Sequence, residues 1–167
     1  ETWKTEQGAR FVRWMEDVPP PPTFVASGGF QGNIDRRAEF EYIAPASVTQ
    51  STGVFDAGKG SKESIDLDGG LKFRLFHHAT PASESEFHYF FSAGVEGVTI
   101  DSPESQKFFQ DVLDAFLEDK LFIEAQQDAV NRNPSERLLL REHDKAVAYA
   151  RQAVAQLRRQ NFATAAE

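Results

Sequence analysis

Segments typical of strands and segments typical of helices are separated along this chain. Runs rich in aromatic and β-branched residues, bounded by turn residues, come first, at 9–15, 35–43, 47–56, 71–78 and 86–94. Two long segments with helical periodicity follow, at 103–130 and 135–159. This order predicts an α+β fold with an antiparallel meander of about five strands. We expect one domain over residues 1–167, with 1–100 mainly β and 101–167 mainly α.

The connections between the first strands carry proline and glycine. Pro19 to Pro22 form a run that favours an extended connector. The glycine-rich stretch 24–33 is predicted to be an irregular turn region, because no strand and helix start frame it as a phosphate loop. Asp68-Gly69-Gly70 predicts a tight turn before the strand at 71–78.

The first helix places a carboxylate among apolar side chains. Ser102 and Pro103 form a suitable N-cap and first turn, and Asn133-Pro134 ends the helix. At about 100° per residue, Asp119 falls on one face with the apolar residues Phe108, Val112, Phe116, Phe122 and Ile123. A buried carboxylate needs a compensating partner. The pattern leaves open a salt bridge to Arg74 and a role as metal ligand or catalytic carboxylate.

The second helical segment is amphipathic. Its apolar positions are Leu139, Ala146, Ala150, Val154 and Leu157, and charged residues occupy the opposite side. We therefore expect this C-terminal helix to pack by one side only. His143 falls on the same stripe and is most simply a packed or partly exposed histidine with no chemical task.

Two neighbouring histidines end the strand at 71–78. Alternation places His77 in an apolar row with Leu71, Phe73 and Leu75, and puts His78 on the other face. His77 is therefore expected to face the core. A strand-end histidine bonded to a backbone carbonyl is the simplest interpretation. His88 on the next strand could approach His77, although the register cannot be derived from the sequence.

Composition excludes several classes of function. The chain has 26 acidic and 18 basic residues, a net charge of −8, and no basic run interleaved with aromatics, so no nucleic-acid partner is expected. It has no cysteine, which excludes thiolate zinc sites and cysteine-bound iron–sulfur clusters in this polypeptide. It has no apolar run of about 18 residues. We expect a cytoplasmic protein with no membrane partner.

Four strings together resemble a known family. They are RWMEDVPPPPTF (13–24), GGFQGNIDR (28–36), FHHATPASESEFHYFFSAG (76–94) and FLEDKLFIEAQQ (116–127). They are similar to the C-terminal part of the catalytic domain of the Rieske non-heme iron oxygenases, in the branch of vanillate O-demethylase and dicamba O-demethylase. The resemblance covers the chain to about residue 130 and more loosely beyond. It is fairly specific, because the order and spacing of the strings agree with the family.

The resemblance implies a helix-grip fold, in which an antiparallel sheet wraps a long helix, followed here by the C-terminal amphipathic helix. It implies a mononuclear Fe(II) held by two histidines and one aspartate, the aspartate being Asp119. It also implies that His77 and Gln50 contact the substrate. The activity implied is O-demethylation or hydroxylation of a small aromatic compound with O2.

The chain also departs from the family pattern. The two iron-binding histidines belong to a D-x-x-H-x-x-x-x-H segment that does not occur in residues 1–167, and the Rieske domain with its [2Fe-2S] cluster is absent. Both are expected in a missing N-terminal part, so this fragment alone is expected to be inactive. The family further implies a reductase or ferredoxin as electron donor and a homotrimer.

Two alternatives come from other functional classes. One is a helix-grip module that binds an apolar ligand without redox chemistry. The other is a structural subunit that docks a cluster-bearing partner through the second helix.

Overall fold

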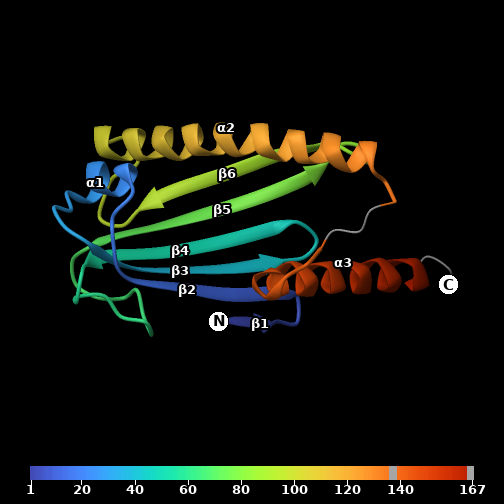
Figure 1. Cartoon of the computed structure of the whole chain (residues 1–167), viewed down its shortest axis with the longest axis horizontal. Helices are drawn as coiled ribbons and strands as arrows, with labels where there is room; N and C mark the ends of the chain where they lie inside the picture. Colours follow the sequence, from blue (N-terminus) through green and yellow to red (C-terminus); the bar gives the residue numbers. More distant parts are fainter. Residues whose placement is uncertain (136–138, 165–167) are drawn as a thin grey trace.

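The computed structural model describes residues 1–135 and 139–164 of the chain (Figure 1). Six strands form one antiparallel sheet whose spatial order is the chain order, β1 to β6. The elements are β1 (Thr2–Lys4), β2 (Gly8–Val18), α1 (Pro22–Gly28), β3 (Ile34–Ile43), β4 (Ser47–Asp56), β5 (Leu71–Pro81), β6 (Phe87–Val95), α2 (Pro103–Arg132), the 3₁₀ turn η1 (Glu142–Asp144) and α3 (Lys145–Thr164). The α+β class and the antiparallel meander are confirmed, and β1 is an additional strand.

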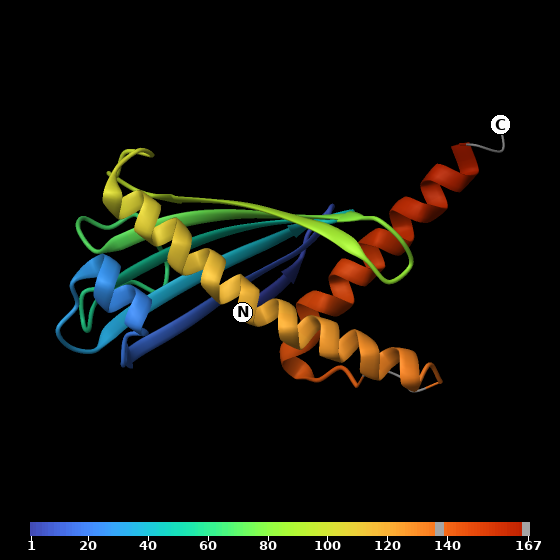
Figure 2. The same ribbon diagram turned by 90° about the horizontal axis from the view of Figure 1, so that it is seen from above.

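Helices α2 and α3 cover the same face of the sheet, here called the inner face. Cross-strand partners point to the same side, and one such row runs from Lys4 through Ala9, Tyr42, Val48 and His77 to Phe91. The Phe91 ring contacts Phe109 and Phe116 of α2. At the other end of the row, the Lys4 amine donates to the Gln152 side chain of α3 at 3.4 Å. Helix α2 therefore lies over β5 and β6, and α3 over β1 and β2 (Figures 1 and 2).

The hydrophobic core lies between the sheet, α1 and the first half of α2. Phe73 of β5 is its centre, with ring centroids 5.8 Å from Phe24 and 5.1 Å from Phe108. The buried cluster consists of Phe24, Phe30, Ile34, Val54, Leu71, Phe73, Leu75 and Phe108. The second half of α2 has no such cover among the described residues, and Phe122 is 78% exposed. The predicted apolar stripe is thus buried near Phe108 and exposed at Phe122 and Ile123.

Helix α1 (Pro22–Gly28) occupies the first part of the segment 24–33, which the sequence predicted to be an irregular turn region. Residues 29–33 are irregular as predicted. Pro22 opens it, because its fixed φ suits the first turn of a helix. Phe24 is buried against Phe73, and the Arg36 guanidinium lies 4.9 Å above the Phe24 ring. Gly29 ends the helix in the left-handed conformation with φ 68°. A seven-residue helix is too short for periodicity to predict it. Its one buried residue, Phe24, packs it onto the core.

Helix α3 begins ten residues later than predicted. The predicted start at 135 adjoins 136–138, which lie outside the described residues, and Leu139 is 79% exposed before η1. The Arg141 amide donates to the Asp144 carboxylate at 2.8 Å, which organises η1 and leads into α3 at Lys145. His143 lies in η1 and is exposed, so of the two predicted environments the packed one does not occur. In the described part of the chain, no helix is long and apolar enough to cross a bilayer.

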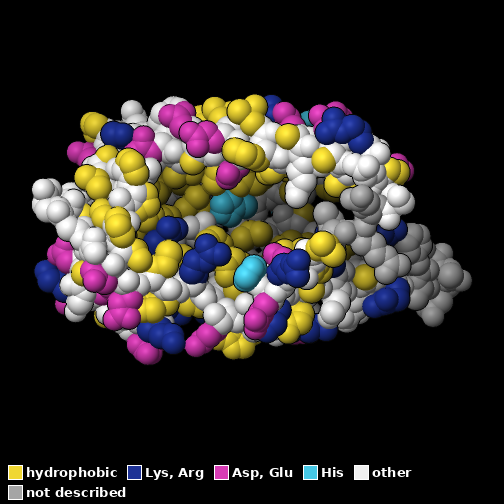
Figure 3. Space-filling view, in the orientation of Figure 1, with side chains coloured by type: hydrophobic (Ala, Val, Ile, Leu, Met, Phe, Trp, Pro, Cys, Tyr) yellow, Lys and Arg dark blue, Asp and Glu magenta, His cyan; other side chains and the backbone are white. Residues whose placement is uncertain are grey.

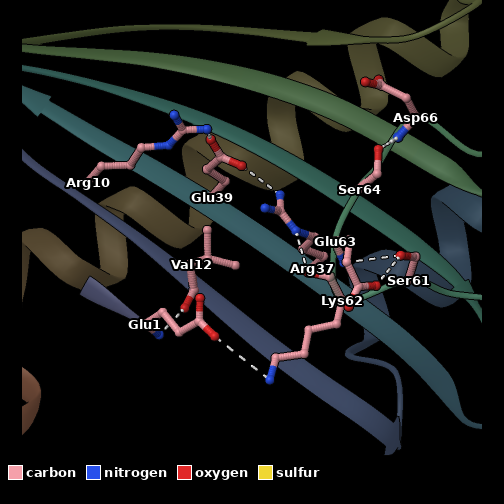
Figure 4. Close-up of polar contacts among 10 residues, drawn as sticks. All are labelled: Glu1, Arg10, Val12, Arg37, Glu39, Ser61, Lys62, Glu63, Ser64 and Asp66. Atoms are coloured by element: carbon pink, nitrogen blue, oxygen red, sulfur yellow. Dashed lines mark hydrogen bonds and ion pairs between the residues drawn. The ribbon is translucent and has the colours of Figure 1, made fainter. Parts of the chain in front are cut away.

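The opposite, outer face is partly covered by the loop 57–70. Arg37, only 9% exposed, donates from Nε to the Lys62 carbonyl at 2.9 Å and from Nη1 to Glu39 at 2.6 Å (Figure 4). Glu39 also pairs with Arg10 of β2. Because a buried guanidinium must satisfy its donors, Arg37 ties the loop to β2 and β3.

The Ser102 cap provides a test of helix α2. Its side chain accepts from the Ser105 amide at 3.1 Å. Replacing Ser102 with alanine is expected to lower the free energy of unfolding by about 1 kcal/mol, because the cap satisfies a free amide of the first turn. Urea unfolding measures the change, and Ser105→Ala, in the same turn, is the control. Equal stability of the two variants would contradict a stabilising cap.

Candidate functional site

His77 lies at the end of an apolar row on the inner face. Leu71, Phe73 and Leu75 precede it on alternate positions of β5 and are buried, while His77 itself is half-buried. Its cross-strand partners are Val48 on β4 and Phe91 on β6. The prediction that His77 faces inward is confirmed. His78 lies on the outer face, where its Nδ1 is 2.8 Å from the Ser47 hydroxyl.

Tyr89 is the polar neighbour of His77. It lies two residues before Phe91 on β6, on the same face of the sheet. Its hydroxyl is 2.5 Å from His77 Nδ1, and the two ring centroids are 6.1 Å apart. Sequence analysis missed this residue. Period-two alternation in the string HYFF, which sets Tyr89 beside Phe91 and apart from His88, was the available signal.

Phe116 of α2 closes the cluster from above. Its ring centroid lies 5.6 Å from His77, 5.6 Å from Tyr89 and 4.9 Å from Phe91. The contacts with Tyr89 and Phe91 are edge-on, a preferred arrangement of aromatic rings. Together Phe116, Tyr89 and Phe91 form an aromatic wall beside the imidazole.

Asp119 follows Phe116 by three residues, so it lies on the same side of α2. Its negative charge acts on Tyr89, which places its carboxylate near the Tyr89 hydroxyl. The side chain is exposed, whereas the sequence predicted burial. Nothing described covers this half of the helix, which is why the carboxylate reaches the surface. No ion pair of Asp119 is found among the described residues, and Arg74 points to the outer face beside Ser51.

Burial sets the protonation of the His77–Tyr89 pair. It lowers the pKa of His77, because a charged imidazole loses hydration there. It also raises the pKa of Tyr89, and the negative charge of Asp119 raises it further. At neutral pH the two side chains are therefore an uncharged imidazole and an uncharged phenol.

Gln50 lies on the neighbouring strand β4, on the inner face. Its cross-strand partner is Leu75, so it sits diagonally from His77. Its side-chain amide donates to the Thr52 hydroxyl at 3.0 Å. The fold thus brings Gln50 and His77 to one face, although none of the hydrogen bonds described joins them. His88 does not share a face with His77, because it pairs with Thr80 and so lies on the outer face of the sheet.

A hollow opens between α2 and the strands, with a histidine inside and an acidic side chain on the helix above it (Figure 3). A second depression of about 520 Å³ is lined mostly by outward-pointing side chains, among them Thr49, Ser51, Arg74 and Phe76. Because these alternate with the inner-face residues, that depression belongs to the other face and is not continuous with His77.

The described residues contain no group of three or more histidine, aspartate or glutamate side chains arranged to hold a metal ion. Asp119 nevertheless suits a metal as a single ligand, because its carboxylate is exposed and has no ion pair among the described residues. A complete metal site is thus not formed within the part of the chain that the structure describes.

A match to a protein-family model shows to which family the chain belongs. The model of the vanillate O-demethylase oxygenase C-terminal domain matches residues 1–160. The chain belongs to this family. Vanillate O-demethylase oxygenase C-terminal domains are parts of oxygenase components, so the family is one of oxidoreductases of the Rieske type.

Two curated relatives come from Comamonas testosteroni. A putative toluene-4-sulfonate monooxygenase system iron-sulfur subunit is 31% identical over 105 residues, covering 63% of this chain and 30% of the relative. The toluene-4-sulfonate monooxygenase system iron-sulfur subunit is 30% identical over 105 residues, with the same coverage. The aligned part of the chain thus spans less than a third of the length of these relatives.

A solved structure has the same fold. Dicamba monooxygenase bound to 3,6-dichlorosalicylic acid matches with a TM-score of 0.77 and 20% identity, over 98% of this chain and 47% of that one. The helix-grip arrangement of this oxygenase C-terminal domain is therefore confirmed. Sheet and long helix both take part in the match.

Proposed function

We propose that this chain is the C-terminal part of the catalytic domain of an oxygenase that O-demethylates or hydroxylates a small aromatic compound with O2. The observation that carries the proposal is the family match over residues 1–160, combined with Asp119 on α2, three residues after Phe116, whose ring packs against His77 and Tyr89. None of the findings favours a non-redox binding module or a purely structural subunit.

Asp119 would be one ligand of a mononuclear Fe(II). The two histidine ligands would come from outside residues 1–167, because the described residues offer no complete set. Bound Fe(II) would supply the activation of O2. The chain's own contribution at this point is a carboxylate on a long helix, with no competing ion pair among the residues that the structure describes.

The inner face would bind and orient the substrate. Phe116 and Phe91 offer ring edges and faces to an aromatic compound and keep water away from it. His77 and Gln50, on adjacent strands, would hydrogen-bond a polar substituent and so direct the methyl or methoxy group toward Asp119. A neutral His77 can serve this purpose because it donates or accepts without carrying charge.

The remaining parts of the system would lie outside this chain. A [2Fe-2S] Rieske cluster cannot be bound here, since the chain has no cysteine, and electrons would come from a reductase or ferredoxin. A homotrimer and a cytoplasmic location belong to the same proposal.

Metal analysis and oxygen uptake of the intact protein, purified without air, test this function. We expect stoichiometric iron at a mononuclear site and O2 uptake that depends on an aromatic acid bearing a methyl or methoxy group. Formaldehyde release would identify demethylation, and a hydroxylated product would identify hydroxylation. A protein that binds the aromatic acid but contains no mononuclear iron would overturn the proposal in favour of a binding module.

A further inference from the structure

One hydrogen bond on the inner face leaves His77 a single free nitrogen. The Tyr89 hydroxyl lies 2.5 Å from Nδ1, and the rings are inclined by 33°. Phe116 packs at 5.6 Å from both rings, so the imidazole is restricted from the side of the helix as well. With Nδ1 engaged, only Nε2 remains for a ligand.

The direction of this bond follows from the acidity of the two groups. A phenol, with a usual pKa of about 10, is a better donor than a neutral imidazole N–H, and an imidazole nitrogen is a better acceptor than a phenol oxygen. Burial lowers the pKa of His77, which leaves a lone pair on the ring. The 2.5 Å contact and the greater acidity of the phenol therefore both favour donation from the Tyr89 hydroxyl to His77 Nδ1.

We propose that Tyr89 is a positioning residue: it donates to His77 Nδ1 and so holds His77 with its proton on Nε2, as a fixed donor to an oxygen acceptor of a bound aromatic ligand. The inference rests on the proposed function only in taking His77 as a ligand contact. If the proton were on Nδ1, or if the ring rotated freely, His77 would not present a donor at a fixed position to the ligand oxygen.

Nitrogen NMR of metal-free, ¹⁵N-histidine-labelled protein tests the bond directly. In the wild type we expect His77 to show a protonated Nε2 and an unprotonated, hydrogen-bonded Nδ1, with His77→Gln assigning the signals. In Tyr89→Phe, the Nδ1 signal should move toward that of a free nitrogen and the pKa of His77 should rise, because the bond favours the neutral ring. A proton on Nδ1 in the wild type, or no change in Tyr89→Phe, would overturn the proposal.

Binding of benzoate provides the second measurement. Tyr89→Phe is expected to weaken it about 2- to 10-fold, the range for one hydrogen bond. Tyr42→Phe is the matched control, because it removes another inner-face hydroxyl, bonded to the Pro45 carbonyl, and should change neither measurement. Equal benzoate affinity of wild type and Tyr89→Phe counts against the inference. Neither measurement requires bound iron. If the proposed iron site is wrong, the NMR and benzoate results still test the role of Tyr89.

Discussion

Replacing Asp119 with alanine is expected to weaken Fe(II) binding by at least about tenfold and to abolish oxygenase activity. Loss of residues that only support metal ligands already costs about 10- to 100-fold in affinity, and Asp119 is proposed as a ligand itself. Stability should not change, because the side chain is exposed and makes no hydrogen bond or ion pair described in the structure. Anaerobic Fe(II) titration and thermal unfolding of the intact protein measure the two effects.

Glu118 provides a matched control for this experiment. It is the adjacent exposed carboxylate of α2, turned about 100° away around the helix axis. Glu118→Gln removes the same charge and should keep the iron. Asp119→Asn keeps the size of the side chain but loses the anionic ligand, so it should behave like the alanine variant. If Asp119→Asn and Glu118→Gln bind iron equally well, the assignment of Asp119 is wrong.

Asp35 is the second residue whose replacement has a large expected effect, here on stability. It is 2% exposed and lies on the outer face of β3. Its carboxylate accepts from the amides of Asp17 at 3.0 Å, Gly58 at 2.8 Å and Gly60 at 3.1 Å. Asp17 has a left-handed φ of 51° and lies in the β-bulge between Met15 and Val18, where the register of β2 with β3 shifts. One carboxylate thus holds both a strained strand end and the start of the loop 57–70.

We expect Asp35→Ala to lower the free energy of unfolding by about 3 kcal/mol, because the three part-buried amides lose the charged acceptor that they share. Asp35→Asn should lose somewhat less, since one carbonyl oxygen remains. Urea unfolding at pH 7 measures both. Asp56→Asn is the control, because Asp56 is exposed and pairs only with exposed Lys59 among the described contacts. A loss as small as that of Asp56→Asn would contradict the role of Asp35.

The pH dependence of stability follows from the same carboxylate. Burial acts to raise the pKa of Asp35, but the amides of Asp17, Gly60 and Gly58 outweigh it and hold the pKa below its ordinary value. The unfolded chain then binds the proton first on acidification, so this stabilisation is present above pH 4 and is lost as pH falls through the folded pKa. Unfolding free energies measured from pH 7 to pH 3 should fall less steeply for Asp35→Asn than for the wild type. If the unfolding free energies of the wild type and Asp35→Asn fell equally steeply with pH, Asp35 would not be the source of this pH dependence.

Local patterns predicted the elements that are long and regular. Alternation in 71–78 placed Leu71, Phe73, Leu75 and His77 on the inner face, because side chains on a strand alternate with a period of two. The Ser102-Pro103 signal located the start of α2 to the residue. Both predictions depend only on neighbours in the sequence, which explains their success.

Short or long-range features were not predictable in the same way. Helix α1 packs through Phe24 against Phe73 and Arg36, which are distant from it in the chain. The pairing of β5 with β6 depends on a register that places Phe91, and not His88, opposite His77. Helix periodicity predicted the direction of Asp119 but not its exposure, since exposure depends on what covers the helix.

The sequence by itself determined the fold class, the inner-face position of His77 and, through the family strings, Asp119 as the candidate iron ligand. These follow from periodicity, capping and recurring motifs, which are local properties of the chain. The tertiary structure alone decided that Tyr89 bonds His77, that Phe116 packs against both rings and that Asp119 is exposed. Those relationships join β5, β6 and α2, and only strand register and helix packing set the distances between them.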